Sequence, residues 1–237
     1  MKTEAIIFDK DGTLLDFDAF WISVSRDAVA DVLNACGCTG ISVDEILELL
    51  GVNDGVTSIE GVLCKGTYAQ MGQIVCAYLD KHGYKTQPDA MVRLITDMYV
   101  KNVDAGEIVP TCPDLPQMMT RLKEKGLKLA VVTTDNREIT LKCLTALGIA
   151  ELMDIIYTDD GQMPTKPNSA CLEDFCCRFG LRKENVVMVG DTLTDVAFAN
   201  NAGISMIGVG KKAENREILR RYIDTVVPDI SYLEAII

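Results

Sequence analysis

Short apolar runs alternate with segments of helical periodicity along most of this chain. Four apolar residues at 5–8 have the length of a buried strand. Five similar runs follow much later, at 127–132, 155–157, 186–189, 204–207 and 225–227. Amphipathic helices are predicted between them, at 113–125, 137–147, 170–179 and up to residue 202. Strands that alternate with helices favour a parallel sheet with right-handed crossovers, so the pattern predicts an α/β fold with a Rossmann-like core.

The segment 17–107 has a different pattern, with helical spacing and no convincing strand. Apolar residues recur every three or four positions from Phe20 to Cys36. Capping boxes begin helices at Ser42 and Thr67, and a proline begins another at Pro88. The sequence therefore predicts a core domain of residues 1–16 and 108–237, interrupted directly after its first strand by an all-helical domain of residues 17–107.

Two aspartates, Asp9 and Asp11, follow the first strand and precede Gly12. In an open parallel sheet, ligands bind beyond the carboxyl ends of the strands. A sharp turn can aim both carboxylates into one crevice, and Gly12 allows backbone geometry that a Cβ would forbid. An Asp-Gly turn that satisfies local amides is the alternative. A calcium loop is excluded, because Leu14 stands where such a loop needs glycine and no Glu follows at its twelfth position.

Other polar side chains gather at later strand ends or connections: Thr133, Thr134, Lys166, Asp191 and Asp195. Each has an ordinary explanation alone, as a strand end, a solvated lysine or a helix cap. Carboxylates without histidine or thiolate suit Mg²⁺, which keeps waters and accepts a phosphate oxygen. Lysine and threonine can donate to the remaining phosphate oxygens. Together these residues favour a Mg²⁺-assisted site for a small phosphorylated metabolite.

Charge and composition restrict the possible partners. The net charge of -12 across 237 residues opposes binding to nucleic acid or an anionic membrane. No apolar run approaches 18 residues, and the first residues lead straight into a strand, so a cytoplasmic protein is predicted, as a monomer or homodimer. Nine scattered cysteines are interpreted as reduced core residues. Since His82 is the only histidine and Cys-x-x-Cys is absent, a zinc site would lack ligands.

A glycine motif at 208–213 imitates a dinucleotide-binding fingerprint after a strand. It lies late in the chain, and a cofactor bound there would explain none of the acidic residues. We therefore do not assign a nucleotide to it.

The order and spacing of these motifs resemble the haloacid dehalogenase-like superfamily of phosphatases, especially its phosphoglycolate-phosphatase-like members. Over the whole chain, Asp9-Lys10-Asp11-Gly12-Thr13 resembles the family's nucleophile loop, Thr133 its second-strand hydroxyl, Lys166 its lysine, and Gly190 to Asp195 its acidic metal motif. Thr134 departs from the pattern, because close relatives often carry Asn there.

The resemblance implies a mechanism and a role for the helical insert. Asp9 would attack phosphorus to form an aspartyl-phosphate, while Asp11 protonates the leaving oxygen and later activates water. Mg²⁺ would be held by Asp9, the backbone carbonyl of Asp11, and the acidic motif that contains Asp191 and Asp195. Thr133, Thr134 and Lys166 would bind the substrate, and the helical insert would be a mobile cap.

Hydrolysis of a small phosphomonoester, of the phosphoglycolate or sugar phosphate type, is the function these residues favour. An acid two residues from the nucleophile can serve both half-reactions, which favours turnover. A sugar phosphomutase on the same core is the alternative, although 18–105 supplies no clear extra base and His82 is a poor candidate. A binding protein on an inactive core would be expected to lose one of the acids, and none is missing.

Overall fold

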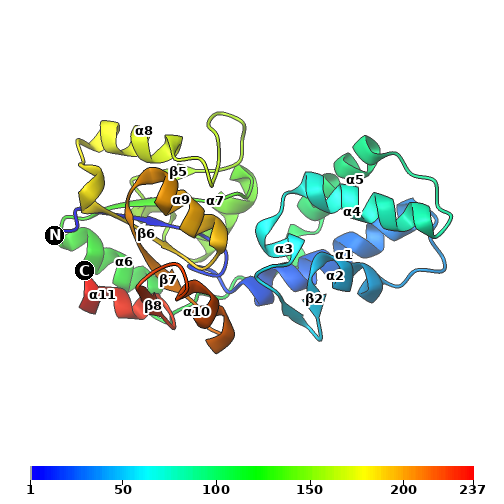
Figure 1. Ribbon diagram of the computed structural model, residues 1–237, viewed down its shortest axis with the longest axis horizontal. Coiled ribbons are helices and arrows are strands. Elements are labelled where there is room, and N and C mark those ends of the chain that lie inside the picture. The colour runs from blue at the N-terminus through cyan, green and yellow to red at the C-terminus, as the bar shows by residue number, and fades with distance from the viewer. Residues whose placement is uncertain (1) are drawn as a thin grey trace. The chain divides into compact units, whose positions relative to one another are not determined.

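The chain divides into two compact units in a computed structural model that describes residues 2–237. The first, here called the α/β unit, contains the residues up to Asp16 and Ile108–Ile237. The second, the helical unit, is Phe17–Glu107. Figure 1 shows a sheet flanked by helices in the α/β unit and helices with one short hairpin in the other.

A six-stranded sheet forms the centre of the α/β unit, and every strand pair in it is parallel. β1 lies between β4 and β6, within the order β5-β4-β1-β6-β7-β8. The strands are β1 (Ala5–Phe8), β4 (Lys128–Val132), β5 (Ile155–Tyr157), β6 (Val186–Gly190), β7 (Ser205–Val209) and β8 (Thr225–Val227). The expected Rossmann-like parallel sheet is thus confirmed.

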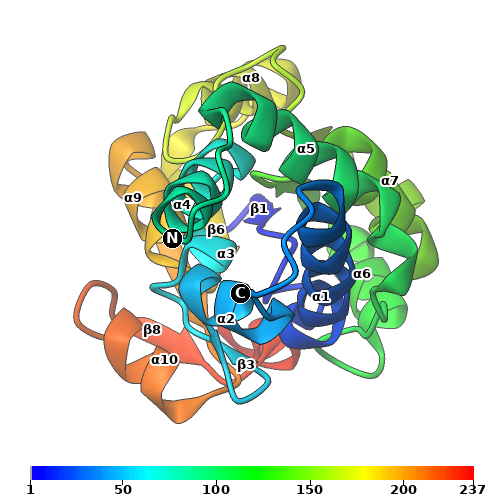
Figure 2. The ribbon, with the colours of Figure 1, turned by 90° about the vertical axis from the view of Figure 1, so that its right-hand side faces the viewer.

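Helices cover both faces of this sheet. They are α6 (Leu115–Glu124), α7 (Arg137–Ala146), α8 (Ala170–Phe179), α9 (Leu193–Ala202), α10 (Ala213–Leu219) and α11 (Leu233–Ile236). Short 3₁₀ turns lie at Ala150–Leu152, Lys183–Asn185 and Ile230–Tyr232. Figure 2 shows α9 and α10 on one side of the sheet and α6 and α7 on the other. Buried on both faces, the inner strands are continuously apolar, as β1 is.

One apolar core lies between the sheet and helices α8 and α9. Alternate strand residues such as Ile7 and Met188 face it, together with Phe175 of α8 and Phe198 of α9. Because strand side chains alternate, Ile6 and Phe8 point to the opposite face, and they are equally buried. This two-sided burial fixes β1 rigidly and so fixes the residues that follow it.

The helical unit consists mainly of α1 (Phe17–Ala35), α2 (Val43–Leu50), α4 (Tyr68–Lys81) and α5 (Pro88–Lys101). The capping boxes are present, since Ser42 pairs with Glu45 and Thr67 with Gln70. A short helix α3 (Val62–Lys65) and a 3₁₀ turn at Val103–Ala105 complete it. The helical insert is therefore confirmed in its main elements.

A small hairpin in this unit was not expected from the sequence. Strands β2 (Val52–Asn53) and β3 (Val56–Thr57) pair antiparallel. Asp54 and Gly55 between them both have positive φ, 51° and 72°, which is the two-residue turn that suits a hairpin. Two-residue strands are too short to show alternation, so the prediction of an insert without strands was wrong at this point.

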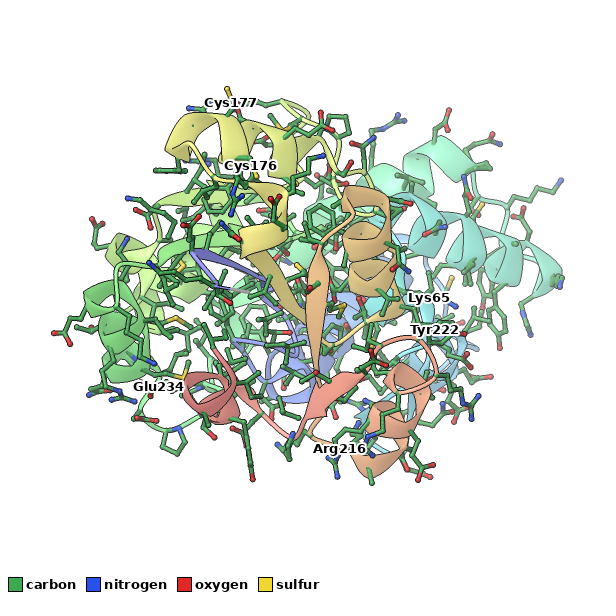
Figure 3. All side chains as sticks on the ribbon, turned by 60° about the vertical axis from the view of Figure 1, so that its left-hand side comes forward. Lys65, Cys176, Cys177, Arg216, Tyr222 and Glu234 are labelled. Carbon is green, nitrogen blue, oxygen red and sulfur yellow. The ribbon has the colours of Figure 1, made fainter. Side chains whose placement is uncertain are left out.

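The nine cysteines are all free thiols, but only four are buried: Cys76, Cys112, Cys143 and Cys171. Cys177 is exposed and lies on the outer side of α8, next to the half-buried Cys176 (Figure 3). The interpretation of all nine as core residues was therefore wrong for Cys177, and the other four are only half-buried: Cys36, Cys38, Cys64 and Cys176. An apolar neighbourhood in the sequence does not fix which side of a helix a thiol occupies.

Within residues 2–237, none of the helices combines the length and the apolar character that a membrane crossing requires.

Candidate active site

The site begins where β1 ends. The backbone of Asp9 still donates to Val189 of β6 at 2.8 Å, after which the chain turns through Gly12. Gly12 has φ 79°, and a Cβ placed there would lie 2.1 Å from Asp191 Oδ2. Only glycine therefore allows the turn after β1 and the carboxylate of Asp191 to occupy neighbouring positions.

The end of β6 brings two further carboxylates to the same edge. Phe8 pairs with Val189 in register, so Asp191 emerges beside Asp9. Asp195 lies in the first turn of α9, where its Oδ2 accepts from the backbone and hydroxyl of Thr192 at 3.0 and 2.7 Å. Gly190 makes room for it, since a Cβ there would lie 2.5 Å from Asp195 Cγ. Capping and site formation thus use the same aspartate.

Three carboxylates form a compact cluster: Asp9, Asp191 and Asp195 each place an oxygen within 4.8 Å of the other two. The carboxylate of Asp11 lies outside this cluster and pairs instead with Lys10, whose Nζ is 2.7 Å from Asp11 Oδ1. Asp191 Oδ1 also accepts from the Thr13 hydroxyl at 3.1 Å. The two aspartates of the first motif therefore have different environments.

Lys166 provides positive charge inside the cluster. Its Nζ donates to Asp9 Oδ1 at 2.7 Å and to Asp195 Oδ1 at 2.6 Å, and the side chain is buried. It lies in the connection between β5 and α8, as the following proline indicates. Burial alone would lower the pKa of this lysine, but Asp195 and Asp9 outweigh that effect and raise it, so Lys166 is a cation.

The electrostatics of the cluster favour a bound cation. Burial, then the charge of Asp195, raises the pKa of Asp9 to about 7, although Lys166 opposes the shift. Burial and the charges of Asp9 and Asp195 raise the pKa of Asp191 well above its usual value. Three close carboxylates with one ammonium leave excess negative charge, which a divalent cation would balance.

The donor set fits a hard cation such as Mg²⁺, since all three side chains offer carboxylate oxygens. Both oxygens of Asp195 already accept hydrogen bonds, from Lys166 and from Thr192. Asp9 and Asp191 each accept a side-chain hydrogen bond at only one oxygen among the described residues. These two are therefore better placed to be direct ligands, and Asp195 to hold Lys166.

Thr133 and Thr134 follow β4, the strand on the other side of β1. Thr133 is buried, and its hydroxyl accepts from the backbone of Asp135 at 3.1 Å. Thr134 is exposed. The structure thus places Thr133 at the same edge of the sheet as Asp9, within a hydrogen-bonded loop, but gives Thr134 no such support.

Two charged residues of this region were not identified from the sequence. Lys10 is fully buried and also pairs with Asp135, whose Oδ2 is 3.1 Å from Lys10 Nζ. They were missed because a lysine between two aspartates in the sequence is expected to be solvated. In addition, Asp135 lies 125 positions from Lys10 in the sequence. The only available signal was the position of Lys10, directly after a completely apolar strand.

The glycine motif at 208–213 has a structural explanation. A Cβ on Gly210 would lie 2.8 Å from Arg216 Cγ, and the Arg216 guanidinium donates to the carbonyls of Gly210 and Lys211 at 2.6 and 2.9 Å. Arg216 reaches back from α10 over this turn (Figure 3). The close approach thus accommodates the side chain of Arg216.

A family model described as haloacid dehalogenase-like hydrolase matches residues 6–209. The chain therefore belongs to the haloacid dehalogenase-like hydrolase family.

Among curated relatives, a glyceraldehyde 3-phosphate phosphatase of Methanothermobacter thermautotrophicus is 30% identical and covers 99% of both chains. A phosphoglycolate phosphatase of Nitrosospira multiformis is 25% identical over 97% of this chain and 93% of its own. Pyrophosphatase PpaX of Halalkalibacterium halodurans is 35% identical, but over only 46% of this chain and 53% of that protein. The expected likeness to phosphoglycolate phosphatases is confirmed.

Solved structures show the same fold. A predicted phosphoglycolate phosphatase from Haemophilus somnus has a TM-score of 0.73 at 19% identity, covering 100% of this chain and 98% of its own. The HAD-hydrolase YfnB from Bacillus subtilis, solved bound to magnesium, has a TM-score of 0.71 at 18% identity, with 100% and 99% covered. A putative beta-phosphoglucomutase from Thermotoga maritima has a TM-score of 0.66 at 20% identity, with 99% and 100% covered.

Proposed function

We propose that this chain is a Mg²⁺-dependent phosphatase that hydrolyses a small phosphomonoester, of the phosphoglycolate or sugar phosphate type, through an aspartyl-phosphate on Asp9. The observation that carries the proposal is the cluster of Asp9, Asp191 and Asp195 at the carboxyl end of the central strand, in which Lys166 bridges Asp9 and Asp195. The names of the curated relatives support a phosphoric monoester hydrolase.

Asp9 is the nucleophile in this proposal. Its carboxylate attacks phosphorus as the bond to the leaving oxygen breaks, which forms an acyl-phosphate. A carboxylate reacts poorly with an anionic phosphate, so the barrier falls mainly through charge neutralisation and in-line positioning. Asp9, Asp191 and the Asp11 carbonyl would hold Mg²⁺, with Asp195 holding Lys166, and the bound ion would supply part of that neutralisation. Lys166 supplies a fixed positive charge 2.7 Å from the attacking carboxylate.

Asp11 is the acid and base. It gives a proton to the leaving oxygen in the first step and removes one from the attacking water in the second. Thr133 donates its hydroxyl hydrogen to a phosphoryl oxygen. Thr134, which is exposed, binds the substrate from the solvent-facing side of the site. The Asp9 and Asp11 side chains contact different lysines, Lys166 and Lys10, so the two carboxylates are held separately.

The helical unit has the role of a substrate-selecting cap in this proposal, and the α/β unit that of the catalytic domain. A cytoplasmic location and a monomer or homodimer complete it. A sugar phosphomutase is the competing hypothesis, since that reaction needs the same nucleophile and acid.

Phosphate release against a panel of substrates tests the proposal. Phosphoglycolate, glyceraldehyde 3-phosphate, sugar monophosphates and inorganic pyrophosphate would be compared with Mg²⁺ and with chelator. We expect inorganic phosphate from at least one monoester, with Mg²⁺ only. Asp97→Asn, an exposed change in the helical unit, is the matched control for active-site Asp→Asn variants. Isomerised sugar phosphate without phosphate release would favour the mutase, and activity in chelator would contradict the role of Mg²⁺.

A further inference from the structure

A second buried lysine lies beside the active site, on the other side of β1 from Lys166. Asp9 and Lys10 both follow β1 directly but have different partners, since the Asp9 carboxylate contacts Lys166 and the Lys10 ammonium contacts Asp11 and Asp135. Lys10 Nζ lies 2.7 Å from Asp11 Oδ1 and 3.1 Å from Asp135 Oδ2. Its side chain is fully buried, with 0% exposed.

Asp135 connects this lysine to the loop after β4. Its Oδ1 accepts from the Asn136 backbone at 2.8 Å, and its own backbone donates to Thr133 Oγ1 at 3.1 Å. The buried Oδ2 has no hydrogen-bond partner among residues 2–237, so the Lys10 ammonium is the charge that faces it. One ammonium therefore links Asp11, on the loop after β1, to the loop that carries Thr133.

The two carboxylates stabilise this buried ammonium. Burial alone would lower the pKa of Lys10, but Asp11 and Asp135 outweigh burial and raise it. Desolvating a lysine is costly, and apolar residues of similar size would pack in its place without that cost. The stability of the fold therefore does not explain why a charged residue is buried at position 10. A role in holding the Asp11 carboxylate in place does explain it.

We propose that Lys10 and Asp135 are positioning residues for the reaction: they fix the carboxylate of Asp11 relative to Thr133, so that a phosphoryl group held at Thr133 meets the acid and base at the correct distance. This inference rests on the proposed function. Lys10 and Asp135 would act without contacting the phosphoryl group themselves. They act through the placement of Asp11 in both half-reactions.

Three variants test the proposal: Lys10→Met, Asp135→Asn and the double variant. Lys10→Met leaves the buried Asp135 carboxylate without its lysine, and Asp135→Asn leaves Lys10 with one of its two carboxylates, so we expect both to lower the urea midpoint of unfolding. The double variant also removes the Asp135 charge that Lys10→Met leaves without its lysine. Its urea midpoint should therefore be higher than that of Lys10→Met. Lys101→Met, which removes an exposed ammonium paired with Asp31, is the matched control and should leave turnover unchanged.

The kinetic readout separates positioning from a purely structural role. We expect kcat to fall by about 10–100-fold in all three variants with KM nearly unchanged, because misplacing a catalytic group by about 1 Å costs about that much. The double variant should stay slow although its stability recovers. With a nitrophenyl phosphate, whose leaving group needs no proton, dephosphorylation should limit turnover, and mass spectrometry should find phosphoryl on the Asp9 peptide of the variants.

Two outcomes would overturn the inference: kcat unchanged in Asp135→Asn and the double variant, or kcat that recovers together with stability in the double variant. If Lys10→Met does not fold, the other two variants still decide. Failure of the proposed function is a separate result, since it would appear as a wild-type protein that releases no phosphate and forms no phosphoryl-Asp9.

Discussion

The two units of the chain differ in whether their charged side chains are buried or exposed. Among residues 2–237, the helical unit buries no charged side chain, and its buried polar groups are the hydroxyls of Ser25, Thr57 and Tyr99. The α/β unit buries five charged side chains, namely Asp9, Lys10, Asp135, Lys166 and Asp195. Ion pairs of the helical unit lie at its surface, as between Arg26 and Asp44, whose side chains are 50% and 70% exposed.

This difference distinguishes the interactions that stabilise the fold from the residues that carry the proposed reaction. The helical unit has a conventional apolar core with two capping boxes. Buried charges contribute little net stability, because desolvation offsets their attraction. Their concentration around the ends of β1, β4 and β6 therefore marks the region where catalysis is proposed.

Asp9→Asn should have the largest effect on activity. The amide keeps the size of the carboxylate but cannot attack phosphorus, so no acyl-phosphate forms and turnover should vanish. Phosphate release and the intact mass after rapid quench would measure this. Residual turnover, or a phosphoryl group on another residue, would show that the nucleophile is misassigned.

Asp11→Asn should slow both half-reactions by roughly 10²–10⁴ each, since it removes the proton donor and the base for water. With a nitrophenyl phosphate the first step is partly rescued and the second is not. An added phosphoryl mass on the peptide that contains Asp9 should then accumulate. Turnover equal to that of the Asp97→Asn control would refute this role.

Ile95→Ala tests the other side of the comparison. Ile95 is fully buried in α5 of the helical unit, and such a truncation typically costs about 2–5 kcal/mol of unfolding free energy. Urea denaturation would measure this cost. Since no charged group is removed, the folded fraction should keep the Asp9 phosphorylation step with a small aryl phosphate. Loss of that step in folded protein would contradict the assignment of the phosphorylation step to the α/β unit alone.

Mg²⁺ should stabilise the protein more at pH 8 than at pH 5.5. The pKa of Asp9 rises from 3.8 to about 7 on folding, so the folded chain holds this proton more tightly and loses stability as pH rises through that range. Mg²⁺ replaces the proton, and at 100 times its Kd the gain should approach about 2.7 kcal/mol at pH 8. Urea midpoints with Mg²⁺ and with chelator give the difference. A larger gain at pH 5.5 would contradict proton competition at the cluster.

Arg26→Ala should have the smallest effect, at most about 1 kcal/mol of unfolding free energy, because its pair with Asp44 is exposed and screened by solvent. Thermal denaturation at low and high salt would measure it. If Arg26→Ala lowered the unfolding free energy as much as Ile95→Ala, the prediction that buried apolar contacts stabilise this unit more than surface ion pairs would be wrong.

Much of the architecture was predictable because local patterns report directly on burial. The apolar run of β1, the alternation after residue 110 and the capping box at Ser42 predicted the parallel sheet and the helical insert. Acids at strand ends predicted that Asp9, Asp191 and Asp195 would meet, and the structure brings them together. Parallel strands end at one edge of the sheet, so a sequence that fixes the strands also fixes this edge.

The sequence by itself thus determined the sheet, the insert and the residue types at the edge where the strands end. Only the tertiary structure decided that Lys10 and Asp135 are buried together, that Asp195 holds Lys166, and that Asp54 and Gly55 form a hairpin turn. The physical reason is that periodicity reports which face of an element is apolar, whereas an ion pair between residues 125 positions apart depends on strand order. Strand order places β4 beside β1, and no local pattern encodes it.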